Sequence, residues 1–263
     1  MTQENAIGIF DSGVGGTSIW KEIVTLLPYE STLYLADSKN APYGHKTEAE
    51  ILQLSIKNTE KLIALKAKII VVACNTATTN AIDYLRKHYD IPFIGIEPAI
   101  KPAALQSKTK TIGILATKGT LNSRLFAETS EKYTEGLKVI EVIGEGLVSL
   151  IEQGRIEDPE TKALLQSYID PMLEAGIDHL VLGCSHYPYL IPLLQELLPD
   201  HIQIIDSGEA VARQTRHILD QQNKLVAITD PTHHIYSNTN TDILESLLTT
   251  HTSNQVHFKY LDF

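Results

Sequence analysis

The two halves of the chain repeat one pattern, and this repeat limits the folds that the chain can adopt. Residues 6–10 contain the apolar sequence Ile-Gly-Ile, and residues 111–115 contain it again. Cys74 and Cys184 follow these segments at nearly equal distances, and each stands directly after another short apolar run. Short apolar runs with turn residues around them are typical of buried strands. The pattern predicts two similar units, each with a cysteine at the end of a strand.

Amphipathic helices are expected between these strands. Thr47 and Glu50 have the spacing of a capping box and precede a helical pattern of apolar residues. In the second half, Asp158 and Pro159 suit the start of a helix that ends near Gly176. Strands that alternate with such helices predict an α/β fold with mainly parallel sheets. Beyond residue 199 we expect strands at residues 201–206, 234–237 and 256–261, and helices at residues 209–220 and 241–248.

The composition argues against several classes of protein. The chain has 263 residues, which fits one large domain or two ordinary ones. The formal net charge is −10 and no lysine or arginine cluster stands out, which argues against nucleic acid or a membrane as partner. No apolar run approaches the roughly 20 residues of a membrane span, and the first residues lack a signal-peptide pattern. We therefore expect a cytoplasmic protein.

The two cysteines carry the clearest chemical signal. A reducing compartment favours free thiols, and a disulfide between Cys74 and Cys184 is the alternative. Each thiol is predicted to stand just before a helix, one formed by the residues after Thr76 and one opened by Pro188. The N-terminus of a helix favours the thiolate, so we expect lowered thiol pKa values. The alternative interpretation of the same positions is that both cysteines are buried and chemically inert.

Polar loops are expected at the C-terminal ends of the strands, where parallel α/β sheets bind ligands. The turn at residues 13–16 is rich in glycine but lacks the lysine of a phosphate loop, so it predicts backbone amides close to a small anion. The four loops are residues 11–13, 74–76, 117–120 and 184–186.

Two side chains in these loops are candidates to assist the thiols. His186 stands two residues beyond Cys184, and Asp11 follows the first strand, which we expect beside the strand that ends at Cys74. Capping of a loop is the alternative role for both. The pair at residues 233–234 is His-His, without metal-ligand spacing or a third ligand, so we predict no metal site.

Two thiols without a redox motif or a metal suit proton transfer at a carbon atom. Removing a proton from one face of a carbon and returning one to the other face needs two bases on opposite sides. Two halves related by a pseudo-twofold axis would supply this arrangement in the cleft between them. A cysteine hydrolase or transferase that uses Cys184 and His186 would leave Cys74 unexplained. A two-lobed amino acid binding protein is a further alternative.

Four motifs are similar to those of a known family. The chain resembles the cofactor-independent glutamate racemases, of the aspartate/glutamate racemase family, over its whole length. The motifs occur in the family's order and are residues 10–16 (FDSGVGG), Asp37 with Pro42-Tyr43-Gly44, residues 73–77 (ACNTA) and residues 183–188 (GCSHYP).

This resemblance implies an architecture and a reaction. It implies two α/β domains, one of residues 1–98 with 208–263 and one of residues 99–207, and an active site between them. The implied reaction interconverts L-glutamate and D-glutamate without a cofactor and supplies D-glutamate for peptidoglycan in the cell wall. Glutamate is then the expected small-molecule partner. Whether the chain forms a homodimer is left open by the resemblance. A racemase that acts on aspartate is the nearest alternative.

The resemblance also assigns roles to residues. It makes Cys74 and Cys184 the acid–base pair, and it gives Asp11, His186 and Glu152 supporting catalytic roles. The chain departs from the family at Ser185, where threonine is usual, and before Glu152, where it lacks a common Cys-Pro. The implied substrate-binding residues are Asp11, Ser12, Pro42, Tyr43, Gly44, Asn75, Thr76, Thr117, Thr120, Ser185 and His186.

Overall fold

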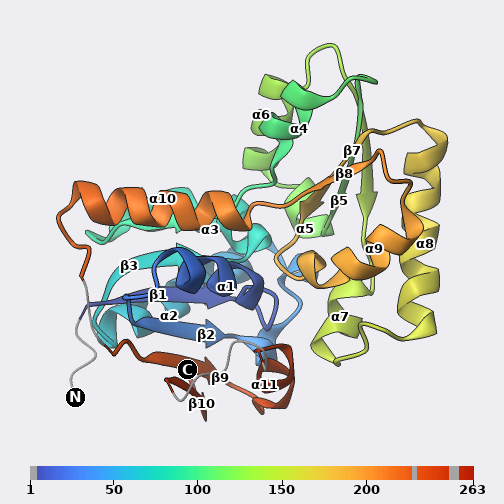
Figure 1. The fold of residues 1–263 in the computed structure, drawn as a ribbon. Helices are drawn as coiled ribbons and strands as arrows, with labels where there is room; N and C mark the ends of the chain where they lie inside the picture. Colours follow the sequence, from blue (N-terminus) through green and yellow to red (C-terminus); the bar gives the residue numbers. More distant parts are fainter. Residues whose placement is uncertain (1–4, 227–229, 249–254) are drawn as a thin grey trace.

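The computed structural model describes residues 5–226, 230–248 and 255–263 of the chain. They form two parallel β-sheets with helices packed on their faces, as Figure 1 shows, so the predicted α/β class is confirmed. No helix in these parts of the chain has the length and apolar character that a membrane span requires.

The elements have the following bounds. The strands of the first sheet are β1 (Ala6–Asp11), β2 (Thr32–Ala36), β3 (Ala67–Val72), β4 (Phe93–Gly95), β9 (His233–Ser237) and β10 (Val256–Tyr260). Those of the second sheet are β5 (Thr111–Ala116), β6 (Lys138–Ile143), β7 (His179–Gly183) and β8 (Gln203–Ile205). The helices are α1 (Thr17–Leu26), α2 (Glu48–Ala64), α3 (Asn75–His88), α4 (Ile100–Gln106), α5 (Lys118–Leu121), α6 (Arg124–Tyr133), α7 (Leu147–Glu152), α8 (Pro159–Glu174), α9 (Ile191–Leu197), α10 (Gly208–Gln221) and α11 (Asp242–Leu248). Single 3-10 turns lie at Ser38–Asn40, Tyr43–His45 and Tyr187–Leu190.

The repeat in the sequence corresponds to one strand order that is used twice. The first sheet has the order β10-β9-β2-β1-β3-β4 and the second has β6-β5-β7-β8, and the strand pairs in both are parallel. The two Ile-Gly-Ile strands, β1 and β5, pair with the two strands that precede the cysteines, β3 and β7. Sheets of this order have a crevice at the C-terminal ends of the central strands. Each cysteine therefore lies at the crevice of its own sheet.

The local signals of the two predicted helices agree with the structure. Thr47 and Glu50 form both hydrogen bonds of a capping box at the start of α2. Helix α8 begins at Pro159, and Gly176 follows its end with a positive φ of 76°.

Two expectations about helices need correction. Pro188 does not open the helix after Cys184, because it lies in the 3-10 turn Tyr187–Leu190 and α9 begins only at Ile191. A second proline at position 192 occupies the first turn of α9, which explains why the helix begins there. The joint predicted at residues 98–109 also contains a helix, α4, whose residues Ile100 and Ala103 are buried against the second sheet.

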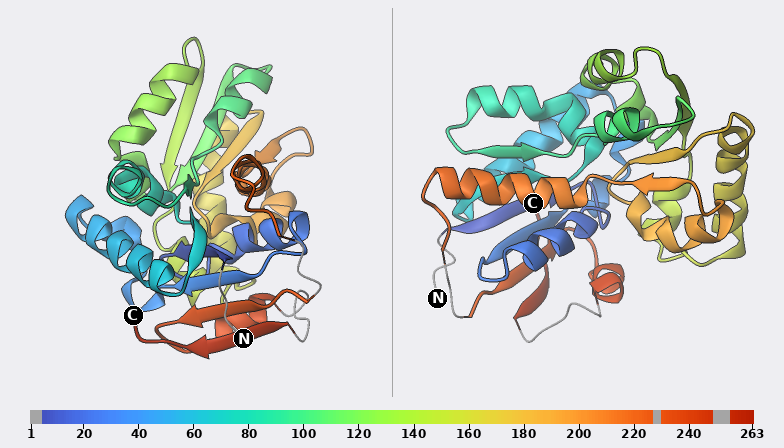
Figure 2. Two further views of the ribbon diagram at one scale, coloured as in Figure 1. Left: turned by 90° about the vertical axis from the view of Figure 1, so that its left-hand side faces the viewer. Right: turned by 45° about the horizontal axis from the view of Figure 1, so that its top comes forward.

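The C-terminal part of the chain returns to the first sheet. β9 pairs with β2, and β10 forms the edge of the sheet beyond β9. Helix α10 packs beside α1, and it lies along this half of the molecule in Figure 1 and in the right-hand view of Figure 2. The predicted strands and helices of this region are present within the described residues. The division into domains at residues 98 and 207 stays a prediction.

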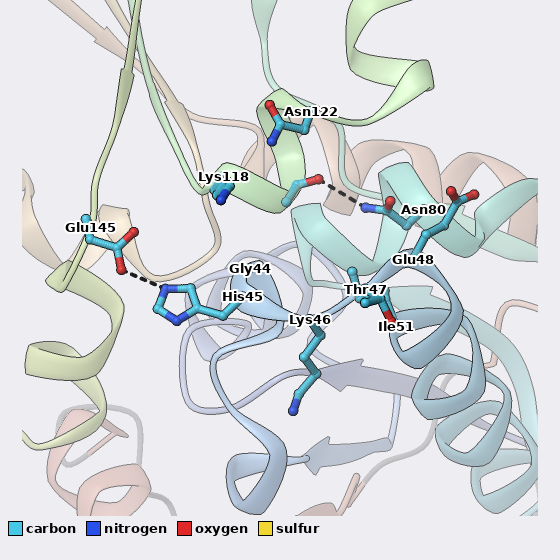
Figure 3. A pocket seen from close by; sticks show the side chains of 11 residues that line it. Gly44, His45, Lys46, Thr47, Glu48, Ile51, Asn80, Lys118, Asn122 and Glu145 are labelled. Atoms are coloured by element: carbon cyan, nitrogen blue, oxygen red, sulfur yellow. Dashed lines mark hydrogen bonds and ion pairs between the residues drawn. The ribbon is translucent and has the colours of Figure 1, made fainter.

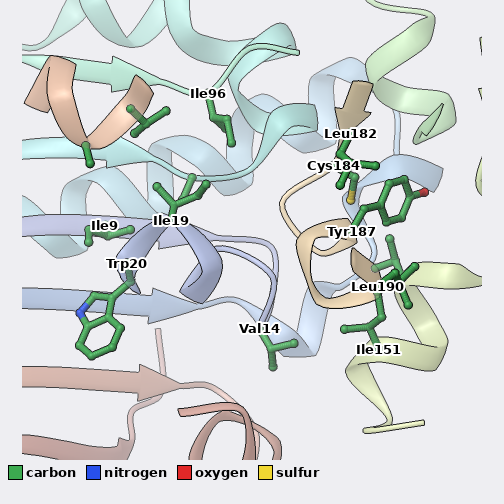
Figure 4. Packing of buried hydrophobic residues seen from close by; sticks show 14 of the residues in the cluster. Ile9, Val14, Ile19, Trp20, Ile96, Ile151, Leu182, Cys184, Tyr187 and Leu190 are labelled. Atoms are coloured by element: carbon green, nitrogen blue, oxygen red, sulfur yellow. The ribbon is translucent and has the colours of Figure 1, made fainter. Parts of the chain in front are cut away.

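One apolar cluster joins the two halves. It includes Ile9 and Trp20 beside the first sheet and Leu182, Tyr187 and Leu190 beside the second, as Figure 4 shows. Because the cluster is continuous, the C-terminal ends of β1, β3, β5 and β7 are held toward the same region.

Candidate active site

A small cavity lies where the central strands of the two sheets end. Its volume is about 10 Å³, roughly the space that one water molecule needs. A glutamate molecule is much larger, so the lining must open before an amino acid can enter. The lining residues are Ser12, Pro42, Tyr43, Gly44, Cys74, Asn75, Thr76, Thr117, Val148, Cys184, Ser185 and His186.

Most of the predicted site residues line this one cavity. Asp11, Glu152 and Thr120 lie behind the lining, where they contact residues that form it. Val148 was missed, because a single apolar residue in α7 gives no signal in the sequence. The structure brings the predicted residues together, whereas their roles stay predictions.

Cys74 is a buried thiol at the start of α3. It is the N-cap residue, and its sulfur accepts a hydrogen bond from the backbone N–H of Ala77 at 3.4 Å. The thiol donates to the hydroxyl of Ser12, with 3.7 Å between Sγ and Oγ. Burial and the carboxylate of Asp11 raise the pKa of this thiol well above its ordinary value. The expected lowering is therefore wrong for Cys74, because burial outweighs the backbone hydrogen bond at the start of α3.

Cys184 is the matching thiol after β7. Only 6% of it is exposed, compared with 4% of Cys74, and both cysteines are free. Its Sγ lies 3.8 Å from Nδ1 of His186, which belongs to the same loop. The predicted pairing of this thiol with His186 is thus present as a contact.

His186 contacts a carboxylate, that of Glu152, which bridges the two halves of the molecule. Its Nε2 lies 2.5 Å from Oε1 of Glu152 in α7, and the same oxygen accepts the backbone N–H of Val14 at 2.7 Å. Burial opposes a charge on the imidazole, but the hydrogen bonds with Cys184 and Glu152 raise the pKa of His186 well above its ordinary value.

The glycine-rich turn after β1 makes this contact possible. A Cβ atom on Gly13 would overlap the carboxylate of Glu152, and one on Gly15 would overlap the ring of His186. The turn therefore needs glycine for the close approach of side chains from the other half, rather than for a phosphate. The amide of Val14 in this turn contacts the carboxylate of Glu152, and binding of a small anion by the turn stays a prediction.

Asp11 links the turn to the loop that carries Cys184. Its carboxylate accepts the Gly13 N–H and the hydroxyl of Ser185, both at 2.9 Å. Burial raises the pKa of Asp11, against opposing effects of His186 and the Gly13 amide. The charge of Asp11 raises the pKa of Cys74, whereas its carboxylate accepts a hydrogen bond from Ser185, the residue after Cys184. Asp11 therefore lies between the two thiols.

Polar groups from α3 and α5 complete the cavity. The hydroxyl oxygens of Thr76 and Thr117 lie 2.8 Å apart, and the hydroxyl oxygen of Thr120 lies 3.2 Å from that of Thr76. Asn75 is buried, and neither its amide nitrogen nor its amide oxygen has a hydrogen-bond partner within the part of the chain that the structure describes. A buried amide without partners is costly, so Asn75 is poised to bind a polar ligand.

A larger cavity of about 470 Å³ adjoins the first at Gly44. It lies between the turn Tyr43–His45 and helix α5, and Figure 3 shows the side chains around it. His45 and Glu145 form an ion pair of 2.9 Å across it, between the two halves. Lys46 and Lys118 also line it.

No group of three or more His, Cys, Asp or Glu side chains within the described ranges is arranged to hold a metal ion. The polar side chains that the small cavity gathers carry thiols, hydroxyls, an amide and an imidazole.

The sequence is similar to that of known racemases. Residues 7–215 match the Asp/Glu/hydantoin racemase family. The glutamate racemase of Ectopseudomonas mendocina is 48% identical over 227 residues, which are 86% of each chain. The glutamate racemase of Cupriavidus pinatubonensis is 47% identical over 221 residues, which are 84% of this chain and 81% of the other.

Solved structures agree with this likeness. The glutamate racemase RacE1 of Bacillus anthracis has a TM-score of 0.88 at 29% identity and covers 99% of this chain and 98% of its own. The Escherichia coli glutamate racemase was solved with L-glutamate and the activator UDP-MurNAc-Ala. It has a TM-score of 0.85 at 31% identity, and the match covers 98% of this chain and 97% of the other. The chain belongs to the Asp/Glu/hydantoin racemase family and, within it, to the glutamate racemases.

Proposed function

We propose that the protein interconverts L-glutamate and D-glutamate by two-base proton transfer between Cys74 and Cys184. The observation that carries the proposal is the position of two buried free thiols, from opposite halves, in the lining of one cavity. One nucleophile would suffice for a hydrolase, which would leave the second thiol without a purpose. The D-glutamate formed would serve peptidoglycan synthesis.

The reaction needs no group beyond the two thiols and the substrate. A thiolate on one face takes the proton from the α-carbon, and the electron pair left behind is delocalised into the α-carboxylate. The thiol on the other face then gives its proton to the α-carbon. The product has the opposite configuration, and the two cysteines have exchanged protonation states, so the reaction runs equally in reverse.

The surrounding residues would support this transfer. His186 would assist Cys184, since its Nδ1 lies 3.8 Å from the sulfur. Asp11 would assist Cys74, since its carboxylate raises the pKa of that thiol. The unpartnered amide of Asn75 and the hydroxyls of Ser12, Thr76 and Ser185 would bind the polar groups of glutamate. Polar groups that are already oriented lose little freedom when the substrate binds.

Single-cysteine variants test this proposal. Cys74→Ala and Cys184→Ala should each lower racemisation of glutamate by about 10²–10⁴-fold or more, because an acid–base group contributes that much. The measurement is circular dichroism of L- and D-glutamate solutions, and aspartate is the comparison substrate. Dialysis of the enzyme against a chelator and a carbonyl reagent before the assay tests whether the activity needs a metal or a carbonyl cofactor.

Elimination from glutamate analogues with a β-leaving group separates the two bases, because it needs only the base that faces the α-hydrogen. The resemblance to the glutamate racemases implies that Cys74 acts on D-glutamate and Cys184 on L-glutamate. Cys74→Ala should therefore still eliminate from the L analogue, and Cys184→Ala should still eliminate from the D analogue. A Cys74→Ala enzyme that racemises glutamate at nearly the native rate would refute the two-base reaction.

A further inference from the structure

The substrate-lining turn at Tyr43 is held by a buried carboxylate behind it. Asp37 follows β2 directly and is fully buried. Its Oδ2 accepts the hydroxyl of Tyr43 at 2.5 Å, and its Oδ1 accepts the side-chain amide of Asn40 at 2.8 Å. Both ends of the segment from residue 40 to residue 43 are thereby tied to one carboxylate.

The hydroxyl of Tyr43 is already engaged in two hydrogen bonds within the protein, and its single proton is used by one of them. It donates to Asp37 and accepts the side-chain amide of Asn58 at 3.0 Å. Tyr43 is nevertheless part of the cavity lining, together with Pro42 and Gly44. The turn therefore contributes its ring and backbone to the cavity, and their position depends on Asp37.

Asn238 connects this carboxylate to the C-terminal part of the chain. It follows β9, is 4% exposed, and donates its side-chain amide to Oδ1 of Asp37 at 2.5 Å. Its side-chain oxygen accepts the backbone N–H of Lys39 at 2.9 Å. The side chain at position 238 must donate to a carboxylate and accept from an amide at the same time, and asparagine does both.

A second C-terminal contact reaches the same carboxylate. Lys57 of α2 forms an ion pair of 3.2 Å with Oδ1 of Asp37, and its ammonium group lies 5.4 Å from the ring centre of Phe263. Asn238 and Phe263 both lie outside residues 7–215, which match the family. Part of the support of the turn thus comes from beyond that match.

We infer that Asn238 is a positioning residue for glutamate: by joining Asp37 to the backbone at Lys39, it holds the turn at Pro42, Tyr43 and Gly44 in the shape that binds the substrate. This inference rests on the proposed racemisation of glutamate. A turn that is held less firmly binds substrate less tightly, while the two thiols keep their places at the start of α3 and after β7.

The test compares steady-state racemisation of L- and D-glutamate by four proteins. Asn238→Ala should raise KM about tenfold in both directions and change kcat less than about threefold, because the variant loses binding and not the acid–base groups. Asn240→Ala is the matched control, since Asn240 is an exposed asparagine two residues away and its substitution should leave KM and kcat unchanged.

Asn238→Asp gives a readout that a purely structural role would not produce. A protonated carboxyl at this position can donate to Asp37 and accept from Lys39, as the amide does, whereas an ionised one faces the carboxylate of Asp37. The other charged or titratable groups at this place are Lys57 and Tyr43, with Glu152 reached through Ser38. The ratio of variant KM to wild-type KM should therefore be near one at about pH 6 and rise about tenfold by about pH 9.

The outcomes are separable. A KM ratio for Asn238→Asp that does not change with pH, or a native KM for Asn238→Ala, would overturn the inference while wild-type racemisation stands. If Asn238→Ala does not fold, the pH dependence of Asn238→Asp alone decides. Absence of glutamate racemisation by the wild-type protein would instead refute the proposed function.

Discussion

At the scale of single residues, hydrogen bonds decide whether the buried imidazole of His186 holds a proton. His186 is buried, yet its bonds with Cys184 and Glu152 raise its pKa well above its ordinary value. The folded protein holds this proton more tightly than the unfolded chain does. The stability that the proton contributes is fully present below the unfolded pKa of about 6.5 and is lost as the pH rises through the folded pKa.

Urea unfolding from about pH 6 to about pH 9 measures this contribution. The free energy of unfolding of the wild-type protein should fall over this range, and that of His186→Gln should fall less. Parallel slopes for the wild type and His186→Gln would contradict the assigned proton.

At the scale of elements, the turn from β1 to α1 is shaped to receive side chains from the other half. Gly15 lies against the ring of His186, so Gly15→Ala must displace that ring from Cys184 and Glu152. We expect a loss of kcat of about 10²-fold or more, since small misplacements of catalytic groups cost that much. The measurement is racemisation by circular dichroism, together with the melting temperature.

Gly136→Ala separates this effect from ordinary loss of stability. Gly136 has a φ of 76°, and a Cβ atom there would meet no other atom of the described residues within 4 Å, so alanine costs about 1 kcal/mol in backbone strain alone. It should lower the melting temperature and leave kcat native. Native kcat in Gly15→Ala would show that the turn does not place His186.

At the scale of the whole molecule, the two halves close over the cavity through a tight contact between α5 and the first half. A Cβ atom on Gly119 would lie 2.8 Å from Cγ2 of Thr76 and 3.2 Å from Cα of Gly44. Gly119→Ala should therefore push the halves apart and raise KM for glutamate several-fold, with a smaller change in kcat.

A double variant tests the cause. Thr76→Ser removes the methyl group that the new Cβ would strike and keeps the hydroxyl that contacts Thr117. Gly119→Ala combined with Thr76→Ser should recover most of the lost affinity, and the non-additivity of the two changes measures the contact. Additive increases in KM would mean that the contact with Thr76 does not control closure.

Much of the fold and of the residue set could be predicted from the sequence, because the signals involved are local. Apolar runs, the capping box at Thr47 and the helix start at Pro159 depend on neighbours a few residues away, and they predicted the α/β class and the strands that precede Cys74 and Cys184. The motifs then pointed to the residues that line the cavity.

The tertiary structure decided what depends on segments far apart in the chain. Local sequence favoured a lowered pKa for Cys74, but burial by both halves and the charge of Asp11 raise it. The contact between Asp37 and Asn238 spans 201 residues and gives no local pattern. Strand and helix propensities act within a few residues, whereas desolvation and buried hydrogen bonds arise only once the chain has packed, so the protonation and support of the site could be learned only from the fold.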